Sequence, residues 1–364
     1  MQRRDVLKTA LALCWLRRLM PSEPAVSTLI GTGTAGFSSR HVSNPYGLVI
    51  GPDRALYFCD LDNQRLRRRD LRTGETRTIA GNGQRGYAGD GGPATAASLN
   101  MPHEIQFDAV GHLYIAERDN HVIRMVHATT GVISTFAGNG LPGFRGDGGP
   151  AREAQLRAPH SIAVDPTGRW LLIGDIGTHR IRCVEFSTGR IDTLAGTGIA
   201  GPTADDAPLK GTPLNGPRAL AFDAGGNLYV ALREGNAVFR VDGSSRRWHR
   251  VAGTGAAGYS GDGGPAHLAT LGGPKGLACS SDVLYIADTE NHVIRAVALK
   301  TRVIRTLLGT GRAGDGPEPD PQECALDRPH GVLLDRNGAL YVSDSENHRI
   351  RVVRESAAAI NGIG

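Results

Sequence analysis

The chain has 364 residues, of which 40% are hydrophobic and 21% are charged, and it contains 50 glycines and 20 prolines. This composition is too apolar for a disordered chain and predicts a globular protein rich in turns. Five cysteines without CxxC spacing exclude a disulfide-stapled fold and a zinc ribbon. Residues 1–25 carry +3 of the net charge of +5, so the remaining chain is nearly neutral, which argues against a nucleic-acid partner.

The first 25 residues are interpreted as a targeting segment. Arg3-Arg4-Asp5-Val6-Leu7-Lys8, followed by a short apolar stretch, resembles the twin-arginine export signal. This resemblance implies a periplasmic or secreted protein. No part of the chain approaches the about 20 consecutive apolar residues that a transmembrane helix needs.

One sequence pattern is repeated six times along the rest of the chain. Each copy begins at a proline and contains four short runs rich in Val, Ile, Leu, Tyr and Thr, separated by turn residues. In the second copy these runs lie near residues 105–107, 113–116, 122–126 and 132–137. One four-stranded antiparallel sheet per repeat, arranged radially, predicts a β-propeller. The anchor prolines, 55 to 58 residues apart, are Pro45, Pro102, Pro159, Pro217, Pro274 and Pro329.

The two ends of the repeat region predict how the ring closes. The sixth repeat stops after Val353 without its fourth strand, while Val26–Gly33 matches the fourth-strand segment Ile191–Gly198. The N-terminal strand is therefore expected to complete the last blade and to cover its open edge. The prediction is an all-β, six-bladed propeller over residues 26–354, with a leader at 1–25 and a flexible tail at 355–364.

The strand sequences also resemble a known repeat family. Leu113–Glu117 followed by Asn120–Arg124, and again Leu284–Asp288 followed by Asn291–Arg295, are similar to the NHL repeat. The resemblance implies a six-bladed propeller and implies no single activity. It is weakest in the fourth repeat, where Leu232 replaces the acidic residue.

Residues that recur from repeat to repeat are interpreted as structural. The Asp-Gly-Gly loops between blades carry ligand types that suit Ca²⁺, but a turn followed by a short helix explains them as well. Cys324 is expected to lie in a loop and to be exposed. One arginine is expected at the same position of each repeat, and one histidine recurs in the loop after the second strand of several repeats. The arginines are Arg67, Arg124, Arg182, Arg240, Arg295 and Arg351, and the histidines are His121, His179, His292 and His348.

The residues directly after the anchor prolines differ between blades and are the candidate site. Because they begin the innermost strands, they are expected to converge at one mouth of the central channel. Three imidazoles can hold zinc or a similar divalent metal, and Arg218 and Lys275 can hold an anionic group. The alternative is that these histidines bond to water or backbone. The six residues are Tyr46, His103, His160, Arg218, Lys275 and His330.

The Pro-His pairs at 102–103, 159–160 and 329–330 are also similar to those of peptidyl-hydroxyglycine amidating lyase. That resemblance implies a catalytic zinc on His103, His160 and His330, although no catalytic tyrosine or arginine of the family maps onto this chain.

Three functional hypotheses follow from these observations. The first is an exported binding module that takes a protein, a glycan or a small anionic ligand on its loop-rich face. The alternative is a metal-dependent lyase or hydrolase centred on the three histidines. RNA binding is a minor third. The sequence leaves open whether the protein is an enzyme.

Overall fold

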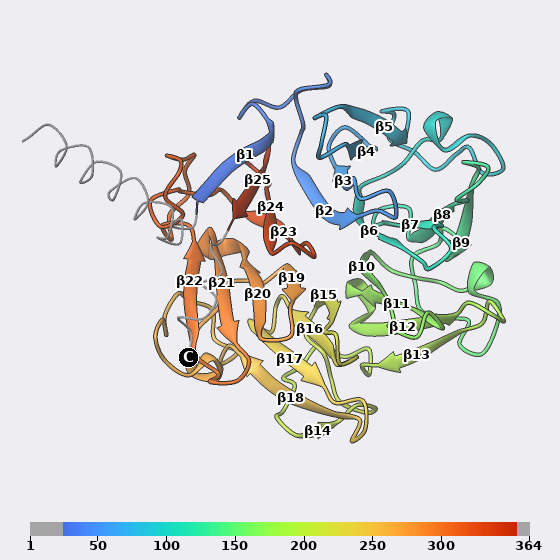
Figure 1. Cartoon of the computed structure of the whole chain (residues 1–364). Coiled ribbons are helices and arrows are strands. Elements are labelled where there is room, and N and C mark those ends of the chain that lie inside the picture. Colours follow the sequence, from blue (N-terminus) through green and yellow to red (C-terminus); the bar gives the residue numbers. More distant parts are fainter. Residues whose placement is uncertain (1–24, 355–364) are drawn as a thin grey trace, which may run out of the picture.

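The computed structural model describes residues 25–354, which form six antiparallel sheets arranged in a ring (Figure 1). The predicted leader lies outside the described residues apart from its last residue, Ala25, which begins the first strand, and the predicted C-terminal tail lies outside them entirely. The six-bladed, all-β prediction is confirmed. No helix among residues 25–354 is long and apolar enough to cross a membrane.

Each blade contains four consecutive strands, apart from the sixth, and blade 4 has one additional short strand. Blades 1 to 3 consist of β2 (Pro45–Ile50), β3 (Leu56–Asp60), β4 (Arg65–Arg69) and β5 (Thr76–Ala80); β6 (Pro102–Phe107), β7 (Leu113–Glu117), β8 (Val122–Val126) and β9 (Ile133–Ala137); and β10 (Pro159–Val164), β11 (Trp170–Asp175), β12 (Arg180–Glu185) and β13 (Ile191–Ala195). Blades 4 to 6 consist of β14 (Ala207–Pro208), β15 (Pro217–Phe222), β16 (Leu228–Leu232), β17 (Ala237–Val241) and β18 (Arg247–Ala252); β19 (Gly276–Cys279), β20 (Val283–Asp288), β21 (Val293–Ala298) and β22 (Ile304–Leu308); and β23 (Pro329–Leu334), β24 (Ala339–Asp344) and β25 (Arg349–Arg354) with β1.

The first strand closes the ring. β1 (Ala25–Gly31) pairs antiparallel with β25, from Ala25 opposite Arg354 to Gly31 opposite Arg349. Val26 and Ile30 of this strand are buried. The predicted closure is confirmed: β1 supplies the outer strand of blade 6.

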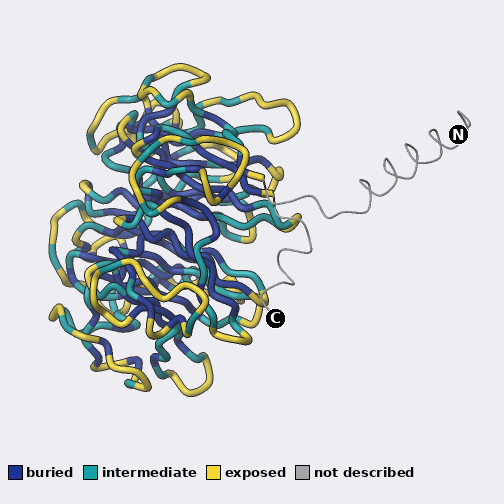
Figure 2. The backbone as a smooth tube through the Cα atoms, turned by 90° about the vertical axis from the view of Figure 1, so that its left-hand side faces the viewer, coloured by how far each residue is buried: buried dark blue, intermediate teal, exposed yellow. Residues whose placement is uncertain are grey.

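The hydrophobic core lies mainly between neighbouring blades, and the exposed segments are loops at the edges of the ring (Figure 2). Short 3₁₀ helices follow the Asp-Gly-Gly turns, as predicted, at η1 (Ala94–Ala96), η2 (Ala151–Glu153) and η4 (Ala266–Leu268). Two more, η3 (Ile176–Thr178) and η5 (Thr289–Asn291), follow β11 and β20.

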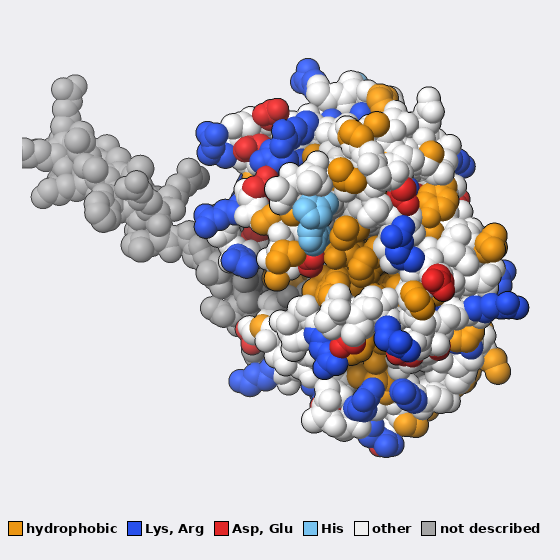
Figure 3. All heavy atoms as spheres, turned by 90° about the vertical axis from the view of Figure 1, so that its right-hand side faces the viewer, with side chains coloured by type: hydrophobic (Ala, Val, Ile, Leu, Met, Phe, Trp, Pro, Cys, Tyr) orange, Lys and Arg blue, Asp and Glu red, His pale blue; other side chains and the backbone are white. Residues whose placement is uncertain are grey.

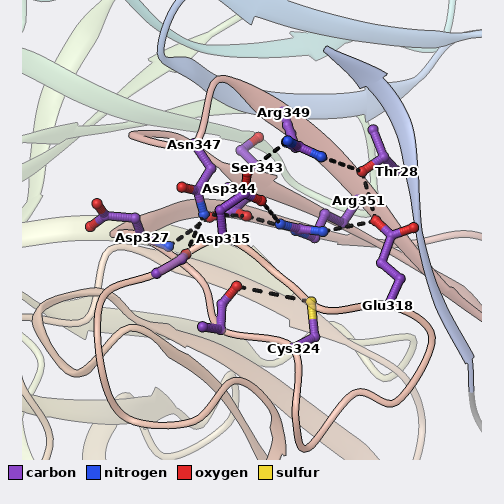
Figure 4. Close-up of polar contacts among 12 residues, drawn as sticks. Thr28, Asp315, Glu318, Cys324, Asp327, Ser343, Asp344, Asn347, Arg349 and Arg351 are labelled. Atoms are coloured by element: carbon purple, nitrogen blue, oxygen red, sulfur yellow. Dashed lines mark hydrogen bonds and ion pairs between the residues drawn. The ribbon is translucent and has the colours of Figure 1, made fainter. Parts of the chain in front are cut away.

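The repeated arginine and acid form buried ion pairs. In blade 6, Arg351 contacts Asp344 at 2.7 Å, Asp315 at 2.6 Å and Glu318 at 2.8 Å (Figure 4). These contacts neutralise a guanidinium that is removed from water.

Blade 2 uses the same arrangement. Arg124 lies 3.3 Å from Glu117 and 2.6 Å from Asp90, and Asp90 belongs to an Asp-Gly-Gly loop. Asp147 and Asp262 of the other two such loops contact Arg182 and Arg295 in the same way. The loop aspartates therefore pair with arginines, which explains their recurrence without Ca²⁺.

Two expectations from the sequence are wrong. The first concerns Arg240, which does not share the position of the other arginines. Val238 of blade 4 pairs with Ala252 just as Ile123 of blade 2 pairs with Ala137. The next residue along each strand is therefore equivalent, and in blade 4 this residue is Phe239 where blade 2 has Arg124.

Cys324 is the second correction. It is fully buried rather than exposed, because its loop folds into the core between blades 5 and 6. Burial also raises the pKa of its thiol to about 11.

Candidate functional site

The six residues that follow the anchor positions meet at one end of the central channel. The Tyr46 ring stacks on His330 at 4.0 Å between centroids and meets His103 edge-on at 4.9 Å. His103 in turn contacts His160 edge-on at 4.6 Å. We call these residues the mouth ring: Tyr46, His103, His160, Arg218, Lys275 and His330.

A polar side chain from each neighbouring blade fixes the backbone that precedes the mouth ring. His121 Nδ1 accepts the amide hydrogen of Ala158 at 3.2 Å, and His348 Nδ1 accepts that of Asn44 at 3.1 Å. His179 and His292 make the equivalent bonds to Gly216 and Arg328. The interpretation of these histidines as structural is therefore supported by their contacts.

Two further blades make the same connection with different side chains. Gln64 Oε1 accepts the amide hydrogen of Met101 at 2.8 Å, and Asn236 Oδ1 accepts that of Gly273 at 2.9 Å. The recurrence of histidine in the sequence does not reveal these two bonds, because any side chain with an acceptor atom at this position can make them.

Two imidazoles of the mouth ring bond to the same backbone segments. His103 Nδ1 donates to Met101 O at 2.9 Å and His160 Nδ1 donates to Ala158 O at 2.7 Å, because a carbonyl oxygen only accepts. Nε2 of both neutral rings is then an acceptor. Burial lowers the pKa of both histidines well below the usual value, and the positive charge of Arg218 lowers it further.

His330 is held differently. Its Nε2 lies 2.9 Å from the Tyr46 hydroxyl and 3.4 Å from Lys275 Nζ, while its buried Nδ1 has no hydrogen-bond partner. Burial and the nearby Lys275 charge lower the pKa of His330 well below its usual value.

The two cations of the mouth ring are unequally neutralised. Lys275 Nζ lies 2.6 Å from Glu290, and burial lowers the Lys275 pKa to about 8. Arg218 is 2% exposed, and it makes no salt bridge among residues 25–354. Its Nη1 is buried without a hydrogen-bond partner. A buried, unpaired guanidinium is costly, so this group is suited to an anion that enters the site.

Glu104 is a site residue that the sequence analysis missed. It follows His103 on β6 and lines the hollow of about 320 Å³ that the inner strands enclose along the channel. Desolvation raises its pKa to about 7, against the opposing effect of Arg218. Gly47 makes room for this side chain, because a Cβ there would collide with the Glu104 carboxylate.

The predicted zinc centre is not favoured by these contacts. Tyr46 and Lys275 occupy the surroundings of His330 Nε2, and the Tyr46 ring lies against both His330 and His103. Residues 25–354 contain no group of three or more His, Cys, Asp or Glu side chains placed to hold a metal ion. The assignment of His103, His160 and His330 to a metal stays a prediction.

The outer surface shows no single basic face on the side seen in Figure 3, where Lys and Arg side chains are spread among neutral and acidic ones. Hydrophobic side chains gather near the middle of that side.

Two family models match parts of the chain. The NHL repeat model matches residues 326–353, and the model "Lactonase, 7-bladed beta-propeller" matches residues 142–242. The ring itself has six blades.

Curated relatives match over longer stretches. SUPPRESSOR OF QUENCHING 1 of Arabidopsis thaliana is 27% identical over 89% of this chain and 26% of that protein. Human NHL repeat-containing protein 2 is 28% identical over 66% of this chain and 37% of that protein. The chain thus spans about a quarter to two fifths of the lengths of these relatives.

Solved structures share the fold at low identity. An auxiliary nutrient binding protein from Bacteroides thetaiotaomicron has a TM-score of 0.66 and 17% identity, covering 92% of this chain and 77% of that chain. A streptogramin B lyase has a TM-score of 0.53 and 14% identity, covering 92% and 98%. The chain is a six-bladed β-propeller, and its sixth blade matches the NHL repeat model.

Proposed function

We propose that the protein binds a small ligand through a carboxylate or another oxyanion at the mouth ring. The observation that carries this proposal is the buried Arg218, whose Nη1 has no partner. Guanidinium groups bind oxyanions through paired, charge-assisted hydrogen bonds. An anion at this position would neutralise the guanidinium and supply the missing acceptor.

The neighbouring groups complete a polar site. The Lys275 ammonium adds a second positive charge. The Nε2 atoms of His103 and His160 are acceptors, so they suit a hydroxyl or amino group of the ligand rather than its oxyanion. A binding role also agrees with the nutrient-binding description of one structural neighbour.

Calorimetric titration with acetate, succinate and inorganic phosphate tests the proposal. Saturable binding of at least one anion is expected, and Arg218→Ala should weaken it at least tenfold, because a charged hydrogen bond contributes about 1.5–3 kcal/mol. Arg152→Ala, which removes an exposed arginine of η2, is the matched control and should leave the affinity unchanged. Equal affinity in both variants would refute the assignment.

Proton transfer at the same site is the second candidate function. Glu104, with a pKa of about 7 and a position next to the mouth ring, is suited to donate or accept a proton near neutral pH. The lactonase family match motivates a screen with lactone and ester substrates. Glu104→Gln should then abolish turnover while substrate binding persists, and a variant with normal turnover would exclude this role.

We also propose export of the protein, on the strength of Arg3-Arg4 and the short apolar stretch that follows. Replacing both arginines by lysine should keep the protein in the cytoplasm. Unchanged extracytoplasmic localisation of that variant would exclude the twin-arginine route.

A further inference from the structure

A second hollow lies between the outer strands of blades 4 and 5. It measures about 460 Å³, within the size range of small-molecule pockets. Blade 4 contributes Tyr229, Arg240, His249 and Val251, and blade 5 contributes Leu299 and Arg302. We call this hollow the 4–5 pocket. It shares no lining residue with the mouth ring.

The equivalent place between blades 2 and 3 is filled by aromatic rings. Phe136 contacts Tyr114 at 4.8 Å and Phe186 at 5.9 Å between centroids. Val251 of blade 4 is the equivalent of Phe136. Each directly precedes an alanine, Ala252 or Ala137, and the strand partners of these two alanines are equivalent. Blade 4 therefore has a smaller side chain where blade 2 has a ring.

The facing blade differs in the same way. Leu299 of blade 5 occupies the position of Phe186 in blade 3. The residue before each, Ala298 or Glu185, donates its backbone amide to the strand that follows, at Val303 or Arg190. Leucine in place of phenylalanine leaves further space. Two smaller side chains thus explain why the 4–5 pocket is open.

The pocket is also charged where the other gap is not. Arg240 and His249 are a cross-strand pair in blade 4, and Met125 and Ser134 are the corresponding pair in blade 2. Arg240 directly follows Phe239, which is the equivalent of the buried Arg124 of blade 2. Since successive strand residues point to opposite faces, this shift turns its guanidinium into the 4–5 pocket.

The positive charge of the pocket is poorly compensated. Arg240 is 3.8 Å from Asp242, and Arg302 makes no salt bridge among residues 25–354. The Arg250 guanidinium bonds to the backbone carbonyl oxygens of Gly253 and Thr203 rather than to a carboxylate. His249 and His267 add two imidazoles, and the lining contains one acidic residue, Asp205.

We propose that the 4–5 pocket binds a small organic phosphate, with the phosphate on Arg240 and Arg302 and the organic part against Tyr229, Val251 and Leu299. Arginine forks match phosphate oxygens, and uncompensated positive charge favours a group with two negative charges. The aliphatic and aromatic wall offers apolar area to the rest of the molecule.

Calorimetric titration with phenyl phosphate tests this assignment, with inorganic phosphate and phenol as the separate halves of the probe. Phenyl phosphate is expected to bind at least tenfold more tightly than either half. Arg240→Met with Arg302→Ala should weaken its binding at least tenfold. The same titrations are repeated with Arg218→Ala, which impairs the mouth ring as a second phosphate site. In that variant, equal affinity for inorganic phosphate would overturn the organic-phosphate assignment, and absent saturation would overturn the site.

A second variant tests the place of binding without removing charge. Val251→Phe with Leu299→Phe copies the aromatic filling of the gap between blades 2 and 3, so it should abolish phenyl phosphate binding and preserve the folded circular dichroism spectrum. Arg218→Ala in the mouth ring should leave that binding intact. If the filled variant binds normally, or if Arg218→Ala removes the binding, the 4–5 pocket is not the site.

Discussion

Blades 2 and 4 have the same strand order around the same kind of core, yet they fill one buried position with opposite chemistry. Blade 2 buries Arg124 against Glu117, whereas blade 4 places Phe239 opposite the strand that ends in Leu232. Both members of the pair have changed together. This is expected, because either charge alone would be buried without its partner.

The same difference also changes the surface of blade 4. With Phe239 in the buried position, Arg240 faces outward into the gap toward blade 5 and keeps 35% of its side chain exposed, while Arg124 has none exposed. An arginine that stabilises the fold in blade 2 thus has a counterpart in blade 4 that is available to a ligand. The comparison separates the part of the repeat that builds the ring from the part that is free to acquire a function.

The largest effect is expected from breaking the charged pair of blade 2. Arg124→Met leaves the buried Glu117 without its cation, so the free energy of unfolding should fall by about 3–5 kcal/mol. Urea denaturation followed by circular dichroism measures the change. Arg77→Met, at an exposed position of β5, is the control and should change stability by less than about 0.5 kcal/mol. A similar small loss for both variants would show that the buried pair is not required.

A smaller effect is expected from opening the gap between blades 2 and 3. Phe136→Val removes a half-buried ring from its contacts with Tyr114 and Phe186, and it should cost about 1–2 kcal/mol of stability. The opposite substitution, Val251→Phe, should not destabilise blade 4, because space for the ring is present there. Thermal denaturation of the two variants compares them directly. Destabilisation of both to the same extent would contradict the equivalence of the two gaps.

A still smaller effect on stability is expected from exchanging both residues of the pair. Glu117→Leu with Arg124→Phe converts the charged pair of blade 2 into the apolar pair of blade 4, so the loss of stability should be at most about 1 kcal/mol, well below that of Arg124→Met. The urea transition of the double variant, measured beside the single variant, gives the coupling between the two positions. Additive losses would show that the apolar pair depends on other features of blade 4, such as Trp248.

The architecture was predictable because it depends on spacing. Six prolines at nearly equal intervals and the match of Val26–Gly33 to an internal strand predicted both the number of blades and the closure by β1. The convergence of the mouth ring was predictable for the same reason. Residues such as His103 and His160 occupy equivalent places at the start of equivalent strands, and a closed ring brings such places together.

The remaining features depend on contacts that spacing does not reveal. Gln64 and Asn236 replace histidine in bonding to the next blade because only an acceptor atom is needed, so residue identity is a poor guide there. The environment of Glu104 depends on the missing side chain of Gly47, in another blade. The position of Arg240 depends on a one-residue difference in register, which a comparison by residue type obscures.

The smallest predicted effect is a change of anion affinity with pH, which should differ between the mouth ring and the 4–5 pocket. Lys275 has a pKa of about 8, lowered by burial and by the charges of Arg328 and Arg218, and raised in part by Glu290. Above this pH the mouth ring loses one positive charge, while its neighbour His330 is already neutral at pH 7. Anion binding at the mouth ring should therefore weaken between pH 7 and pH 9, by less than tenfold, because Arg218 keeps its charge.

Succinate is a suitable probe for this effect, because both of its carboxyl groups are ionised throughout that range. Lys275→Arg should reduce the decrease, since an arginine in this place stays protonated to higher pH. The part that remains is expected from the ionisation of Glu104, whose pKa is about 7. Binding of phenyl phosphate in the 4–5 pocket should not follow the ionisation of Lys275, because no residue of the mouth ring lines that pocket. A parallel decrease at both sites would show that a change common to the whole ring, rather than the Lys275 ammonium, controls the affinity at the mouth ring.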